Sequence, residues 1–329
     1  MSTISQQPYS GVHCETTAFM NLALSAGTMI TEPMAFGLGR GLSFIFWHSK
    51  KMPTPFLGGR IQPDQIIRNA AAALEIGLNE EQTSSSRKAE ASLRHHLAEG
   101  RVVALKLDRF YLEYTNEHHH FPAHYVACLS CSDEDVVVVE TEPLGIKSTS
   151  TASVARARAA TGAMSSRHLA FTIASQDDHP VVPTRDSCRS AIHRTATDFL
   201  NPTFGNSGHK GIAKAAGRIT SWAETLEDPV ATAHRVGVFM ERGGTGGGMF
   251  RSLWADFLRE AHALCQNRAY LQAATQYDEL ASTWTSLADL LMHATRASIV
   301  HDLERGGAML AELGRQEKET MAMLATATQ

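Results

Sequence analysis

A cysteine near the start of the chain stands where an amphipathic helix should begin. Residues 14–26 place Phe19 and Leu22 on one apolar face, and Gly27 follows as a helix stop. The unpaired N–H groups and the dipole of a helix N-terminus stabilise an anion, so Cys14 is well placed to react as a thiolate. The same N–H groups could bind an oxyanion. The alternative is a small buried thiol, which is the usual fate of a free cysteine.

A nucleophilic thiol needs an imidazole within hydrogen-bond reach, and that ring needs an acceptor that orients it. His124 begins an apolar strand at residues 124–129, and Glu140 ends the next one at residues 135–140. The polar connection is short, so the strands should form an antiparallel hairpin in which the start of one lies beside the end of the other. His124 and Glu140 should therefore meet. A strand-end carboxylate in solvent is the alternative, and Glu142 is a weaker substitute.

Two other groups of side chains resemble metal ligands but are poorly arranged for a metal. Neighbouring residues of an extended chain point in opposite directions, so the side chains of His118–His120 do not converge on one ion and fit a polar loop better. Cys128 and Cys131 form a CxxC motif, but no second CxxC follows and Cys128 lies in the predicted strand. We expect structural or incidental thiols there, and no metal.

The elements that would position these residues divide near residue 180. Before it, helix and strand signals alternate, with helices at 63–74 and 86–99 and further strands at 43–48, 101–107 and 168–173. After the polar segment 176–180, helical periodicity dominates residues 185–200, 209–226, 249–267, 270–293 and 297–323. We expect an α+β fold, with a catalytic domain at residues 1–180 and a mostly helical domain at 181–329 that covers or completes its cleft.

Composition excludes several functions. The 329 residues carry a net charge of -4, which gives no general attraction to nucleic acid or anionic membranes. No apolar run approaches the ~20 residues that span a bilayer. Residues 1–11 lack the basic and apolar regions of a secretory signal, and five widely spaced cysteines do not form a disulfide framework, so we expect a cytoplasmic location. Apolar residues of the last predicted helix fit packing within their own domain, while a homo-oligomer stays open.

Several segments resemble a known family. In the first half they are His13–Leu22, Glu32–Phe44 and Phe121–Val126 with the hairpin that ends at Glu140, and these are similar to the N-terminal domain of butirosin biosynthesis protein H. In the second half, Glu241–Arg251 and Trp254–Ala261 resemble the helical domain of unknown function that often follows it. The resemblance covers most of the chain.

The resemblance implies a papain-like fold and an acyltransferase of natural-product and antibiotic biosynthesis. Such an enzyme takes an acyl group from the phosphopantetheine thioester of an acyl carrier protein and delivers it to an amine of a small molecule, with no bound cofactor. Cys14 would be the nucleophile and His124 the base. Glu140 would be the third residue, at a position where the family more often has Asp.

A glycine-rich loop, Gly243–Gly248, precedes a helix expected to start near Met249. Glycines permit close backbone approach, and a helix N-terminus suits an anion. One hypothesis is that this loop, through Gly246, meets the phosphopantetheine phosphate while Arg242 or Arg251 assists. A tight interdomain turn is the alternative that we favour. The loop lacks the Lys-Ser/Thr ending of a P-loop, so ATP is not expected.

Two other functions share these sequence features. A cysteine hydrolase on the same fold, either a thioesterase or a peptidase, would use the same residues with water in place of the amine. A non-catalytic binding module would have kept the fold without the chemistry. The sequence does not identify the acyl group or the amine acceptor.

Overall fold

The chain forms two compact units that interleave along the sequence. The computed structural model describes residues 7–49, 52, 54–162, 164–165, 167–174 and 181–329. The first unit combines the chain up to Ala35 with Ile66–Pro183, and the second combines Phe36–Gln65 with Thr184–Gln329. The sequence suggested one break near residue 180. The segment 176–180 lies outside the described residues, and residues 36–65 belong with the second unit rather than the first.

The first unit is built on a six-stranded antiparallel sheet with the order β3-β8-β4-β5-β6-β7. Its strands are β3 (Leu78–Glu81), β4 (Val103–Leu107), β5 (His124–Cys131), β6 (Asp135–Val139), β7 (Ile146–Ser150) and β8 (Ala170–Ile173). The predicted hairpin is β5 with β6, in which Ala127 pairs with Val139. The predicted strand near residue 170 joins the same sheet as β8.

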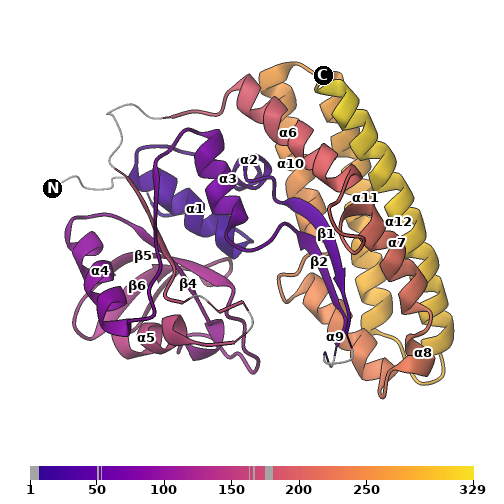
Figure 1. The fold of residues 1–329 in the computed structure, drawn as a ribbon, viewed down its shortest axis with the longest axis horizontal. Coiled ribbons are helices and arrows are strands. Elements are labelled where there is room, and N and C mark those ends of the chain that lie inside the picture. Colours follow the sequence, from indigo (N-terminus) through magenta and orange to yellow (C-terminus); the bar gives the residue numbers. More distant parts are fainter. Residues whose placement is uncertain (1–6, 50–51, 53, 163, 166, 175–180) are drawn as a thin grey trace. The chain divides into compact units, whose positions relative to one another are not determined.

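Helices α4 (Ser86–Ala98) and α5 (Thr151–Ala159) pack on one face of this sheet (Figure 1). Leu93 of α4 and Val154 of α5 belong to one core cluster with strand residues such as Leu105 and Val126. Alternate residues of a strand point to opposite faces, so every second residue of β4 and β5 contributes to this cluster. Each helix begins at a serine cap, as Ser85 accepts from Lys88 N.

Helix α1 (Cys14–Ser25) packs against β4 and β5, where Ala104 and Ala127 are fully buried. Alanines on this face let a helix backbone come close to the sheet. Ten of the helix's twelve residues are buried. The predicted helix is confirmed, and Gly27 ends it with a φ of 76°, a conformation that glycine adopts without strain. The side chain of Glu15 accepts from the amides that open α3 (Gln65–Ala73).

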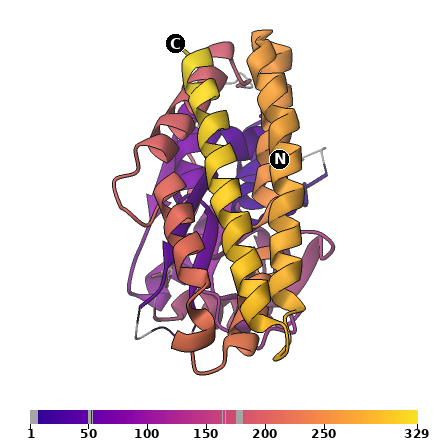
Figure 2. The ribbon, with the colours of Figure 1, turned by 90° about the vertical axis from the view of Figure 1, so that its right-hand side faces the viewer.

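The second unit is a helical bundle that holds a two-stranded hairpin. Its elements are β1 (Leu42–Trp47), β2 (Phe56–Arg60), α6 (Arg185–Leu200), α7 (Gly208–Ile219), α8 (Trp222–Thr225), α9 (Pro229–Glu241), α10 (Gly248–Cys265), α11 (Arg268–Met292) and α12 (Ile299–Ala327). The remaining short elements of the chain are α2 (Glu32–Leu38) and a 3-10 turn at Arg109–Tyr111. Figure 2 shows α12 running beside both α7 and α11.

Aromatic packing explains why residues 36–65 join the helical unit. The ring of Phe44 on β1 lies 5.5 Å from that of Trp284, and Phe36 stacks on Phe250 with ring centroids 5.4 Å apart. Gly59 N also donates to Thr245 O at 2.8 Å. These partners are more than 180 positions away along the chain, so local sequence patterns did not reveal them.

The α+β class, the antiparallel sheet and the helical second half are confirmed. The helix predicted at 209–226 is broken, because α7 ends at Ile219 and α8 follows as a separate turn. The sequence analysis missed β2, β3, β7 and α9, although Asp228 caps α9 and Pro229 opens it. Among the described residues, no helix combines the length and apolarity needed to cross a membrane.

Candidate active site

Cys14 is the first residue of α1, as predicted, and its side chain is half-buried. Thr17 N donates to His13 O at 2.9 Å, which closes the first helical turn. The amides of Cys14 and of the two residues after it therefore have no acceptor within the helix. Such amides and the helix dipole favour negative charge just outside the helix start.

A carboxylate fixes the segment that leads into Cys14. Glu32 accepts a hydrogen bond from Val12 N at 2.8 Å and another from His13 N at 2.9 Å. Gly11 allows this close passage, because a Cβ there would lie 2.5 Å from the Glu32 carboxyl group. Since the two amides before Cys14 are occupied, the amides of the first turn of α1 are the ones placed to receive an oxyanion.

His124, the first residue of β5, is 3% exposed and hydrogen-bonds with Cys14. Its Nε2 lies 2.8 Å from Glu140 Oε1. Because the carboxylate engages Nε2, Nδ1 is the ring nitrogen left for the hydrogen bond with Cys14. The predicted meeting of His124 and Glu140 is confirmed, and the structure brings Cys14 to the same ring.

Glu140 follows β6 directly and is fully buried. Besides the histidine, its Oε1 accepts from the Tyr114 hydroxyl at 3.1 Å, and its Oε2 accepts from Thr141 N at 3.0 Å. The Ser10 hydroxyl donates to its main-chain carbonyl at 2.8 Å. Glu142, the weaker substitute, is exposed. The carboxylate that orients the imidazole is therefore Glu140.

The electrostatics of the pair favour a charged imidazole and a charged carboxylate. Burial by itself lowers the pKa of His124, but the Glu140 charge and the hydrogen bond with Cys14 outweigh it and raise the pKa to about 10. Burial by itself raises the pKa of Glu140, but the His124 charge and its hydrogen bond bring the pKa below its usual 4.5. The ring is thus poised to stabilise a thiolate at neutral pH.

Three residues of this site were missed by the sequence analysis. Glu32 holds the segment before Cys14, Tyr114 donates to Glu140, and the charge of Arg109 helps to lower the pKa of Glu140. The last two come from the long connection between β4 and β5. No periodicity or motif marked them, since a loop residue gains its partner only from the tertiary fold.

The three histidines of that connection do not converge. Nδ1 of His120 lies 2.8 Å from Asp108 Oδ2, and its ring rests 4.2 Å from that of Phe110 between centroids. His118 and His119 are exposed. Within the described parts of the chain, no group of three or more His, Cys, Asp or Glu side chains is arranged to hold a metal ion.

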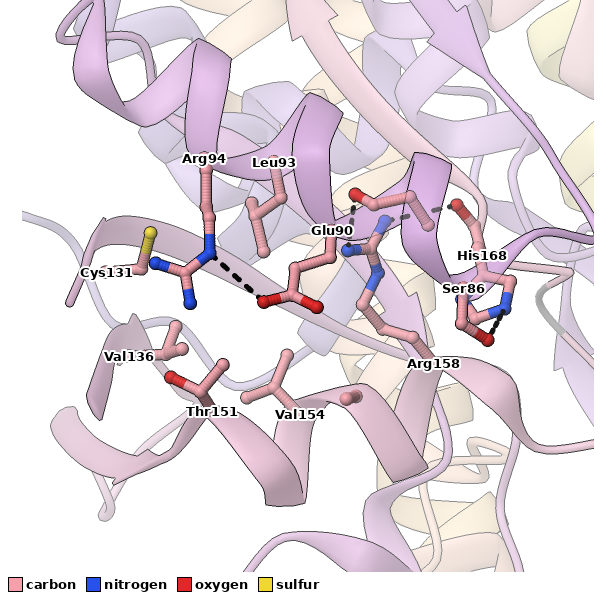
Figure 3. A pocket seen from close by; sticks show the side chains of 12 residues that line it. Ser86, Glu90, Leu93, Arg94, Cys131, Val136, Thr151, Val154, Arg158 and His168 are labelled. Carbon is pink, nitrogen blue, oxygen red and sulfur yellow. Dashed lines mark hydrogen bonds and ion pairs between the residues drawn. The ribbon is translucent and has the colours of Figure 1, made fainter. Parts of the chain in front are cut away.

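A surface hollow lies between α4 and α5, apart from the candidate site (Figure 3). Apolar side chains such as Leu93 and Val154 line it, and on α4 Arg94 pairs with Glu90, four residues earlier, at 3.1 Å. Cys131 of the CxxC motif lies at its edge. Its partner in the motif, Cys128, is buried in the core, which raises the pKa of that thiol, and both thiols are free.

The glycine-rich loop has its own internal partners. Gly247 N donates to Met240 O at 2.9 Å, and Gly248 N donates to Glu241 Oε1 at 3.1 Å. A side chain of the protein therefore already occupies the anion position at the start of α10. Gly246 has a φ of 79°, and a Cβ there would lie 1.8 Å from the Phe250 ring. These contacts make the loop a packed turn of the second unit rather than an open phosphate cradle.

Arg251 is fully buried in the same unit and is ion-paired with Glu317 at 2.9 Å. Its guanidinium lies 4.3 Å from the Trp284 ring centroid, and Trp284 Nε1 donates to Glu317 at 2.6 Å. No surface of Arg251 is left for a substrate phosphate, which contradicts the suggested role. Arg242 is exposed just after α9, and its role stays a prediction.

Comparisons with known proteins agree with the segments that carry the resemblance. The family described as Butirosin biosynthesis protein H, N-terminal, matches residues 13–141, which include Cys14, His124 and Glu140. The family described as Domain of unknown function (DUF4872) matches residues 152–324. No curated protein matches the chain. The chain thus belongs to the DUF4872 family and carries ahead of that domain an N-terminal domain of the butirosin biosynthesis protein H family.

Proposed function

We propose that the chain is an acyltransferase of antibiotic biosynthesis, which moves an acyl group from the thioester of an acyl carrier protein through Cys14 to an amine. The observation that carries the proposal is the contact of Cys14, at the start of α1, with the buried His124–Glu140 pair. The match of residues 13–141 to a family named for butirosin biosynthesis supports a role in antibiotic biosynthesis. The papain-like character of the first unit is part of the same proposal.

In the first half-reaction the Cys14 thiolate attacks the thioester carbonyl carbon. The carbonyl oxygen becomes an oxyanion, which the amides at the start of α1 stabilise. The bond from that carbon to the phosphopantetheine sulfur then breaks, and the leaving thiolate takes the proton of His124. The result is an acyl group on Cys14 and a neutral imidazole. Exchange of one thioester for another is nearly isoenergetic, so this step needs no nucleotide.

In the second half-reaction an amine attacks the acyl group on Cys14. Acylation has removed the Cys14 charge and its hydrogen bond, both of which raise the pKa of His124. The pKa of the ring therefore falls, and more of the ring is neutral and able to accept a proton when the amine must lose one. His124 takes that proton as the carbon–nitrogen bond forms, and the Cys14 sulfur leaves as a thiolate, which restores the ion pair. Amide formation from a thioester is downhill.

Intact-mass measurement after mixing with an acyl-loaded carrier protein tests the proposal. We expect the acyl mass on the native chain and none on Cys14→Ala. The control is Cys131→Ala, which removes another half-buried thiol and should keep the adduct. An equal adduct on Cys14→Ala would refute the nucleophile. Release of free acid at the same rate with and without amines would instead establish hydrolysis.

A further inference from the structure

Tyr114 shares a carboxylate oxygen with the histidine of the candidate site. Its hydroxyl lies 3.1 Å from Glu140 Oε1, the same atom that lies 2.8 Å from His124 Nε2. We infer that Tyr114 is a positioning residue that limits the basicity of His124 through Glu140, so that the ring can give up its proton in each turnover. The inference rests on the proposed function.

The phenol is a permanent donor. Burial, together with the nearby Glu140 charge, raises the pKa of Tyr114 far above that of an exposed tyrosine, so it stays neutral wherever the protein is folded. A neutral phenol beside a carboxylate can only donate. On the other oxygen of Glu140, Thr141 N donates as well. The Glu140 carboxylate therefore accepts three hydrogen bonds, from His124, Tyr114 and Thr141 N.

The number of hydrogen bonds that Glu140 accepts affects how strongly it holds the imidazolium proton of His124. A carboxylate that receives fewer hydrogen bonds holds its remaining donor more strongly. If the phenol hydroxyl were removed, Oε1 would serve His124 alone and would bind the imidazolium proton more tightly. The tyrosine thus weakens the hold of Glu140 on that proton without breaking the geometry that orients the ring.

The two half-reactions need opposite protonation states of the His124 ring. Acylation needs the imidazolium, which stabilises the Cys14 thiolate. Aminolysis needs the neutral imidazole as base. A more basic His124 would preserve acylation and slow aminolysis. General loss of structure would slow both half-reactions, so the direction of the effect separates positioning from damage.

The first experiment measures the pH titration of the His124 ring and needs no substrate. Histidine labelled with ¹⁵N is titrated by NMR in Cys14→Ala, where the thiol no longer contributes, and His124→Gln identifies its signal among the 16 histidines. Adding Tyr114→Phe should raise the His124 titration midpoint by about 0.5–1 pH unit, since hydrogen bonds to a charged group are worth roughly 1.5–3 kcal/mol and part of this is transferred to the ring. An unchanged or lower midpoint would overturn the inference.

Tyr111→Phe is the matched control. Tyr111 lies in the same connection, and among the described residues its hydroxyl takes part in no side-chain hydrogen bond with Glu140. Removing that hydroxyl should leave the His124 midpoint where it was. An equal shift in both variants would assign the effect to the loop as a whole and refute a specific role for Tyr114.

The second experiment separates the half-reactions. With Tyr114→Phe at pH 7, we expect the acylation rate within about twofold of native and aminolysis slowed by about three- to tenfold, as the larger population of imidazolium implies. The difference in aminolysis rate between Tyr114→Phe and the native chain should disappear as the pH rises. Equal slowing of both steps would refute the inference. If the native chain forms no acyl-enzyme, the proposed function fails, and the titration alone still decides the role of Tyr114.

Discussion

Removing the negative charge of Glu140 should slow the acylation of Cys14 about a thousandfold. Glu140→Gln keeps an acceptor for His124 and Tyr114 but removes the negative charge. The rise of the His124 pKa from 6.5 to about 10 corresponds to roughly 5 kcal/mol in favour of the imidazolium, and burial opposes that rise, so the charged partners supply at least this much. Without the carboxylate the buried ring should be mostly neutral at pH 7.

The kinetic size of the effect follows in two parts. An ordinary thiol is only a few per cent ionised at pH 7, so losing the ion pair costs about 30-fold. Poorer proton donation to the leaving thiolate adds about 10- to 100-fold. Single-turnover acylation followed by intact mass measures the total, and iodoacetamide alkylation of Cys14 against pH isolates the first part.

Glu142→Gln is the matched control for this variant, because it removes an exposed carboxylate two residues away. It should acylate within about twofold of native, as surface charge changes are weakly coupled to buried groups. A Glu140→Gln chain that kept more than a tenth of the native rate with an unaltered pH profile would refute the charge argument. Thermal unfolding of both variants checks that the fold is intact.

Three further predictions concern stability. Folding raises the pKa of His124 and lowers that of Glu140, so the thermal unfolding midpoint should be highest at about pH 5–6.5. The midpoint should decline between pH 6.5 and about 10 as His124 loses its proton, and it should also decline as the pH drops below 4.5 and Glu140 gains one. A midpoint that does not change with pH would contradict this. Glu317→Gln should cost about 3–5 kcal/mol in urea unfolding by leaving Arg251 buried without its counter-charge, and a cost under 1 kcal/mol would disprove the assignment. Gly246→Ala should lower the unfolding free energy by about 2 kcal/mol or more through its positive φ and its contact with the adjacent ring, and a neutral result would show that the loop relaxes.

The parts of the site that the sequence could predict are those with local signals. The start of α1 is marked by its apolar face and by Gly27, and the pairing of His124 with Glu140 follows from two strands joined by a short polar turn. Both are short-range features, since the hairpin aligns residues only 16 positions apart. Once these elements are placed, the antiparallel hairpin and the pairing of His124 with Glu140 follow.

The parts that could not be predicted depend on distant partners. Tyr114 and Glu32 are ordinary polar residues until the fold brings Glu140 and the segment before Cys14 beside them. One hypothesis gave Arg251 a role in binding a substrate phosphate, but its partner is Glu317, which lies 66 positions away. A charged side chain therefore gives no sign in the sequence of whether solvent, substrate or a buried counter-charge will neutralise it.

The interleaving of the two units has a consequence for synthesis. The β1–β2 hairpin leaves the ribosome early, yet Trp284, against which Phe44 packs, follows 240 positions later. At about 5–20 residues per second, the nascent hairpin waits on the order of ten seconds or more with an aromatic face uncovered. A ribosome that stalls before the last helices would leave that face exposed permanently, so truncated products of this gene should be chaperone clients rather than free catalytic fragments.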